Sequence, residues 1–235
     1  MTDTQAELKA RLSAVKTKRG FLLPHHGLLA LAFPDLLAGY DAAYTAMALA
    51  DRVLSHHDRE FVWLAVLAAT DESLATHHIA NFRAAGGDDA GISAAFAASG
   101  WAIGGAAYDF AARAWVKQLA PWDPQAAYLE GVRRLAPQRL VHLAQLAVHV
   151  CKAHWRLLRW QIAAAYTDRV PENEIAEALT LAMFPGSIPH FVEACGVWRA
   201  MIAGGEVTAS APYRVWAEFE GQGGYDEAAR AKTSR

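Results

Sequence analysis

Residues 58–92, DREFVWLAVLAATDESLATHHIANFRAAGGDDAGI, decide the fold class. The run from Phe61 to Ala69 is apolar throughout and rich in alanine and leucine, which favour helix. A helix that is apolar on all sides belongs in the centre of a core. A second helix is predicted to begin at Asp71 and to end at Gly86 and Gly87.

Helices are also predicted on both sides of this stretch, and no segment alternates between apolar and polar residues as a half-buried strand does. Ser55 to Asp58 supplies the N-cap of the central helix. The sequence therefore predicts an all-α protein, a bundle of helices around one core. The other expected helices cover residues 7–18 before Gly20, a segment beginning at Pro34, a short alanine-rich segment from Asp88, a longer one after Gly104 and Gly105, and residues 212–220.

Composition and charge exclude several classes of protein. The 235 residues are 54% hydrophobic and 20% charged, with a net charge of −2 and scattered basic residues. The scattered basic residues form no face of the kind that binds nucleic acid, so the sequence does not predict a nucleic-acid-binding protein. The N-terminal residues carry no apolar signal segment, so we expect a cytoplasmic protein. Residues 90–108 are uncharged but broken by glycines, which favours close-packed soluble helices over a membrane span.

The order of elements recurs after Pro121. A shift of 83 residues places Ile79 on Ile162 and Trp115 on Trp198, and the loop GGDDAGI falls on RVPENEI. Agreement of turn signals and apolar positions together predicts a tandem repeat. The expected domains are a first repeat at 1–120, a degenerate second repeat at 121–210, and a C-terminal helix with a frayed tail at 211–235.

The candidate site lies around Glu60, Asp71 and His78. Asp71 and His78 are seven residues apart, so on one helix they would share a face. Glu60 would face them from the preceding helix. A carboxylate that holds an imidazole in one tautomer makes a general base near neutral pH. Two simpler interpretations stay open: Asp71 as an N-cap, and Glu60 as an ion-pair partner of Arg59.

Residues 58–92, together with RGFLLPHHGLLALAFPDLLAGYDAAY at 19–44, resemble the carboxymuconolactone decarboxylase and AhpD-like alkylhydroperoxidase superfamily. Its members typically read R-E, an apolar helix, C-x-x-C-x-x-H-H or a cysteine-free version of it, A-x-x-x-G and an acidic turn. The resemblance covers about residues 20–115 well and 125–200 more weakly. It implies an AhpD-like helical bundle with two degenerate repeats, and places the family's glutamate on Glu60.

The same resemblance implies that the two redox cysteines are replaced. Their positions hold Asp71 and Leu74, and neither side chain can act as a thiolate or a resolving thiol. The chain's two cysteines, Cys151 and Cys195, lie far apart and are expected to be reduced and buried. Any chemistry at this site is therefore expected to move protons.

The second repeat has lost this set, because the corresponding positions hold other residues. They are Leu143, His154, Trp160 and Gln161. We still expect His149 and His154 to face a pocket from the second half. The pairs at His25 and His26 and at His56 and His57 do not predict a metal site, since adjacent helical residues point about 100° apart. No cofactor is expected.

These observations predict a cofactor-independent decarboxylase, lyase or isomerase for a small organic acid or lactone. The catalytic residues would be His78, Glu60 and Asp71, with His77, Arg59, Trp63 and His154 binding the substrate. The alternative is a non-catalytic binding or assembly protein on the same fold, and the third reading is a peroxidase using Cys151 and Cys195. The expected partners are a small-molecule substrate and further copies of the chain, which would form a trimer or dimer. Neither nucleic acid nor a membrane is expected as a partner.

Overall fold

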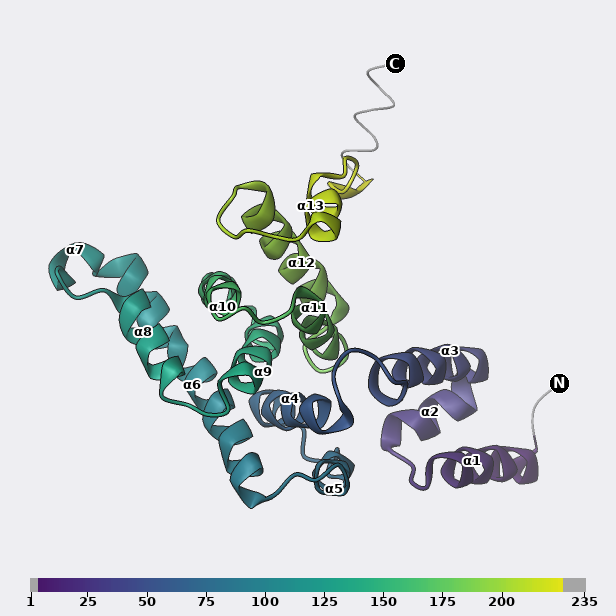
Figure 1. The fold of residues 1–235 in the computed structure, drawn as a ribbon. Coiled ribbons are helices and arrows are strands. Elements are labelled where there is room, and N and C mark those ends of the chain that lie inside the picture. Colours follow the sequence, from purple (N-terminus) through teal and green to yellow (C-terminus); the bar gives the residue numbers. More distant parts are fainter. Residues whose placement is uncertain (1–3, 226–235) are drawn as a thin grey trace, which may run out of the picture. The chain divides into compact units, whose positions relative to one another are not determined.

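The computed structural model describes residues 4–225, and within that range it contains helices and no strand (Figure 1). The predicted all-α fold class is confirmed. The described chain forms two compact units, one up to Asp51 and one from Arg52 onward. The first unit carries the N-terminal helices, and the second carries the candidate site.

The first unit consists of α1 (Gln5–Arg19), α2 (Pro24–Ala32), α3 (Pro34–Tyr44) and a π-helical turn, η1 (Thr45–Leu49). Thr4 caps α1 through a capping box with Glu7, and Gly20 ends it at a φ of 79°. Proline occupies the first turn of α3, as predicted. Helix α2 packs against both α1 and α3.

The second unit is built around two buried helices, α4 (His56–Thr70) and α9 (Gln138–Cys151). Figure 1 shows them side by side, and α4 also packs against α5 and α6. Every residue of α9 from Leu140 onward is buried. The other helices of this unit are α5 (His77–Ala84), α6 (Asp89–Ala114), α7 (Val116–Leu119), α8 (Pro124–Arg133), α10 (Trp155–Thr167), α11 (Glu172–Leu181), α12 (Ile188–Ala203) and α13 (Ala211–Glu218).

Most of the apolar run of α4 is buried inside a single chain, against α6 and α9, while Leu67 is half-buried and Ala68 is exposed. Burial of these residues therefore requires no further copy of the chain. The central position predicted for this helix is confirmed.

Helix α6 replaces the two helices expected from Asp88 and after Gly104, because the glycines do not interrupt it. Gly105 lies on the buried face, where a Cβ would come within 2.9 Å of Leu157 and Tyr128. By length and composition α6 could cross a membrane. One face of α6 packs against α4, α8 and α9. Cytoplasmic localisation remains a prediction from the sequence.

The shift of 83 residues that defines the predicted repeat can be applied to the helix bounds. Residues 56–70 of α4 plus 83 give 139–153, close to the bounds of α9, and residues 77–84 of α5 plus 83 fall within α10. The counterpart of α6 is divided into α11 and α12. The repeat and its boundary near residue 120 remain predictions. The predicted C-terminal helix is present as α13, and residues 226–235 of the expected tail lie outside the described residues.

Candidate functional site

The first polar side chains of α4 set the geometry of the site. Ser55 caps the helix by accepting a hydrogen bond from the backbone N–H of Asp58, as predicted. Arg59 and Glu60 follow in the next turn and are both buried. Because neighbouring residues on an α-helix point about 100° apart, these two side chains reach different neighbours.

Glu60 points to α5 and pairs with His78. Nδ1 of His78 lies 2.6 Å from Oε2 of Glu60, and the side chains of His78 and Glu60 are 4% and 7% exposed. An ionised carboxylate can only accept hydrogen bonds, so Nδ1 carries the proton and donates it. Within the described part of the chain, Nε2 of His78 has no hydrogen-bond partner. The pair predicted from the sequence is thus brought together.

Two further side chains hold this pair in place. Trp63 lies three residues after Glu60 on the same face of α4, and its ring stacks on His78 with centroids 4.7 Å apart. Asn81 lies three residues after His78 on α5 and donates from Nδ2 to Oε1 of Glu60 at 3.3 Å. Sequence reasoning missed Asn81, although its spacing from His78 was a signal. His77 is half-buried, with its ring centroid 4.2 Å from that of His78.

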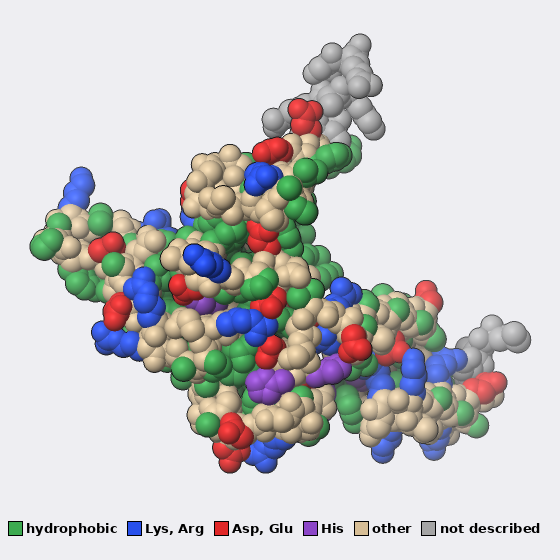
Figure 2. Space-filling model, in the orientation of Figure 1, with side chains coloured by type: hydrophobic (Ala, Val, Ile, Leu, Met, Phe, Trp, Pro, Cys, Tyr) green, Lys and Arg blue, Asp and Glu red, His purple; other side chains and the backbone are tan. Residues whose placement is uncertain are grey.

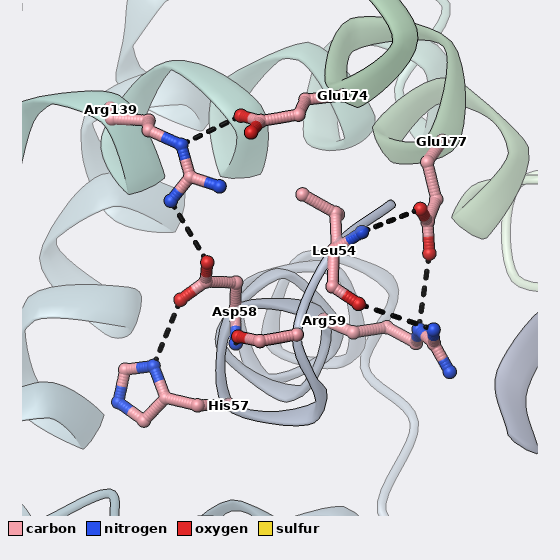
Figure 3. A network of polar contacts seen from close by, with 8 residues as sticks. Leu54, His57, Asp58, Arg59, Arg139, Glu174 and Glu177 are labelled. Atoms are coloured by element: carbon pink, nitrogen blue, oxygen red, sulfur yellow. Dashed lines mark hydrogen bonds and ion pairs between the residues drawn. The ribbon is translucent and has the colours of Figure 1, made fainter. Parts of the chain in front are cut away.

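Arg59 does not face the Glu60–His78 pair, so the prediction that it binds the substrate is wrong. Its Nε donates to Oε1 of Glu177 on α11 at 3.2 Å, and Nη2 donates to the carbonyl oxygen of Leu54. Glu177 also accepts the backbone N–H of Leu54 at 2.8 Å. Figure 3 shows Asp58 and Arg59 leaving α4 in different directions, Asp58 toward Arg139. Arg59 therefore stabilises the start of α4 from inside the core.

Asp71 does not begin a helix. It ends α4 in the left-handed conformation, at a φ of 62° and a ψ of 33°, and α5 begins only at His77. Aspartate tolerates that conformation better than most residues. The argument that Asp71 and His78 share one helical face is therefore wrong. Asp71 and Leu74, at the positions of the family's cysteines, are both exposed in the loop between the two helices.

A cavity of about 270 Å³ lies beside this loop, between α4, α5 and α6. Its walls are mostly apolar, with Asp71 among the polar groups. Neither Glu60 nor His78 lines it. The lining residues are Leu64, Leu67, Ala68, Asp71, Glu72, Ser73, Ala75, Thr76, Ile79 and Phe96.

One family model matches part of the chain, including the Glu60–His78 pair. Residues 34–118 match the model of the carboxymuconolactone decarboxylase family. This segment is therefore similar to that family, over rather more than a third of the chain. The match ends near α7, so it includes α4, α5 and α6 and the whole Glu60–His78 site. No curated protein and no solved structure matches the chain in these comparisons.

Both thiols lie outside the segment that matches this family. Cys151 is buried at the end of α9, and burial raises the pKa of its thiol to about 12. Burial also raises the pKa of Cys195, on α12. A thiol with a raised pKa supplies little of the reactive thiolate at neutral pH.

His149 and His154, which were expected to face a pocket from the second half of the chain, lie next to each other and not beside His78. His154 precedes α10, and its ring centroid lies 6.0 Å from that of His149. His149 is fully buried and faces the hydroxyl of Tyr128, with 3.0 Å between Nε2 and the oxygen. Neither histidine lines the cavity beside α5. The structure places His154 next to His149 rather than beside His78.

A polar cluster that sequence reasoning missed lies at the α9–α10 junction. Nε2 of His142 lies 2.7 Å from Oδ2 of Asp168, and its Nδ1 lies 2.6 Å from Nε2 of Gln161. Gln161 stands at the position that the predicted repeat assigns to His78. Asp168 lies outside the repeat's motif and 26 residues after His142, so the sequence pattern did not predict that these two residues would pair.

Acidic and basic side chains are interspersed on the face that Figure 2 draws, with hydrophobic side chains between them. This agrees with the scattered charges of the sequence. Nothing in that pattern forms a single basic stripe of the kind that binds a nucleic-acid backbone.

Proposed function

We propose that the segment similar to the carboxymuconolactone decarboxylase family forms a cofactor-independent acid–base enzyme, a decarboxylase, lyase or isomerase for a small organic acid or lactone. The observation that carries this proposal is the short contact between His78 and Glu60. The family's cysteine positions hold Asp71 and Leu74, so proton transfer is the chemistry available to the residues that are left.

His78 is the proton-transferring residue in this proposal. With its Nδ1 proton held by Glu60, Nε2 presents a lone pair that accepts a proton from the substrate. Glu60 then stabilises the imidazolium, as the carboxylate of a catalytic triad does. Asn81 and Trp63 keep the carboxylate and the ring in position. His77 and Trp63 are the proposed substrate contacts, while Arg59 and His154 take no part.

The substrate approaches from the cavity beside α5, where Asp71 meets it. Because the cavity does not reach Glu60 or His78, the α4–α5 junction has to open by a small movement during turnover. Helix α5 is eight residues long and packs mainly on α4, so its displacement disturbs few other contacts.

The test measures carbon dioxide release and lactone consumption with carboxymuconolactone and a panel of related lactones and keto acids. His78→Gln and Glu60→Gln are each expected to lower kcat by about 10²- to 10⁴-fold. His190→Gln is the matched control, because His190 also packs against a tryptophan, Trp155. Unchanged turnover in His78→Gln contradicts the assignment.

The double variant Cys151→Ala, Cys195→Ala distinguishes this proposal from the hypothesis that the protein is a peroxidase. Acid–base activity is expected to survive in that variant, since neither thiol takes part. If peroxide reduction is found in the parent and disappears in the variant, the chemistry belongs to the thiols.

The second candidate is a non-catalytic binding or assembly protein. The burial of both members of the pair favours it, because a buried Glu–His contact also stabilises a helix junction. This candidate predicts no turnover across the panel, and a lower midpoint of thermal unfolding in His78→Gln than in His190→Gln.

Assembly of the chain into a homotrimer or dimer also remains a proposal. It is supported by large apolar side chains exposed on α6, Phe96, Ile103 and Phe110. The test is the molar mass in solution by light scattering, and a mass equal to that of one chain over the working concentration range contradicts it.

A further inference from the structure

A second cavity, of about 180 Å³, lies between α8, α9 and α10, outside the segment matched by the family. Leu129, Val132 and Ala164 supply apolar walls. Two side chains of opposite charge, Arg133 and Asp168, line the same space. The cavity combines an apolar floor with polar groups, which is typical of small-molecule sites.

Arg133 and Asp168 do not form an ion pair with each other. The ion pair of Arg133 is with Glu130, three residues earlier on α8, at 3.3 Å. Asp168 contacts His142 through Oδ2, and its Oδ1 has no partner within the described residues. Arg133 contacts Glu130 through Nη1 alone, so its other N–H donors, like Oδ1 of Asp168, can contact a ligand.

The carboxylate of Asp168 is held from behind by buried groups. His142 is 1% exposed, with Nε2 on Asp168 at 2.7 Å and Nδ1 on Gln161 at 2.6 Å. Burial lowers the pKa of His142, and this outweighs the opposing effect of Asp168, so the imidazole is neutral near pH 7. A neutral ring donates one hydrogen bond and leaves Asp168 its negative charge. Fixing the anion in advance reduces the entropy lost on binding.

We propose that this cavity binds a small zwitterionic amino acid. Its carboxylate pairs with Arg133, its ammonium group pairs with Asp168, and its short aliphatic body lies against Leu129 and Val132. The volume limits the ligand to a few heavy atoms, well below drug size. This cavity does not involve Glu60 or His78, so the proposal is independent of the proposed function.

The test is an NMR titration of the full chain with labelled histidine, following the ring signals of His142, which a His142→Gln variant assigns. The probes are glycine, β-alanine and 4-aminobutanoate, with propanoate and propylamine as analogues that carry one charge each. At least one zwitterion is expected to shift the His142 signals and to bind about fivefold or more tightly than either analogue. No shift with any zwitterion, or equal binding of propanoate or propylamine, overturns the proposal.

Matched variants test the two contacts. Arg133→Gln and Asp168→Asn are each expected to weaken zwitterion binding by about fivefold or more. Arg134→Gln is the control: Arg134 also pairs with Glu130, at 3.4 Å, but does not line the cavity. Equal binding in Arg133→Gln and Arg134→Gln overturns the assignment of the carboxylate contact. Circular dichroism melting of each variant checks that the fold is kept, and the Arg133 pair decides the outcome if Asp168→Asn fails to fold.

Discussion

Nδ1 of His78 lies 2.6 Å from Oε2 of Glu60, although 18 residues of chain separate them. The contact joins α4 to α5 and places an imidazole between a carboxylate and the ring of Trp63. Since the carboxylate can only accept, this geometry selects one tautomer of the histidine.

The first prediction concerns that tautomer. Nitrogen NMR of labelled histidine should show His78 protonated on Nδ1 in the parent protein. Glu60→Leu removes the acceptor, so the signal should move toward the Nε2-protonated form. Glu72→Gln, a carboxylate change in the adjacent loop, should leave it where it is. An Nε2-protonated His78 in the parent protein would show that the contact does not form in solution.

The second prediction concerns the buried pair of Arg59 and Glu177 (Figure 3). Arg59→Ala leaves a buried carboxylate without its cation, and should lower the free energy of unfolding by about 3–5 kcal/mol. Arg134→Ala, which removes an exposed ion pair, should cost less than about 1 kcal/mol. Urea unfolding measures both. Equal losses in the two variants would contradict a structural role for Arg59.

The third prediction compares two helical glycines. A Cβ at Gly131 in α8 would lie 1.8 Å from the ring of Trp101, so Gly131→Ala should destabilise the protein by about 1–3 kcal/mol. At Gly100 in α6 a Cβ meets nothing within 4 Å. Gly100→Ala should therefore raise stability by up to about 1 kcal/mol, because alanine favours helix. Thermal unfolding of both variants checks the sign of each change.

The fourth prediction concerns pH. Burial lowers the pKa of His149 to about 3. The unfolded chain takes up this proton near pH 6.5 and the folded chain only near pH 3, so stability falls as pH falls through that window. The contribution of His149 approaches about 1.4 kcal/mol per pH unit below 6.5. His149→Gln should lose less stability than the parent between pH 6.5 and 5, measured relative to pH 8. Parallel curves would show that His149 is not buried as a neutral ring.

Much of the site could be predicted from sequence where the spacing is local. The apolar run of α4, its cap at Ser55 and the end of α1 at Gly20 follow from side-chain propensities and capping chemistry. The pairing of Glu60 with His78 could be expected because a short connection brings consecutive helices together. The single helix α6 could not, since the close approach of Gly105 to Leu157 of α10 and Tyr128 of α8 exists only in the folded chain.

The amino-acid sequence by itself determined that the chain is helical, that thiols are missing from the positions of the family motif, and that an acid–base pair stands in that segment. Those properties depend on residue types and on spacing within one or two helices. The tertiary structure decided where Arg59 points, how Asp71 ends α4, and that His142 meets Asp168. Each of these depends on packing between elements far apart in the chain, such as Arg59 on α4 and Glu177 on α11, which local chemistry does not encode.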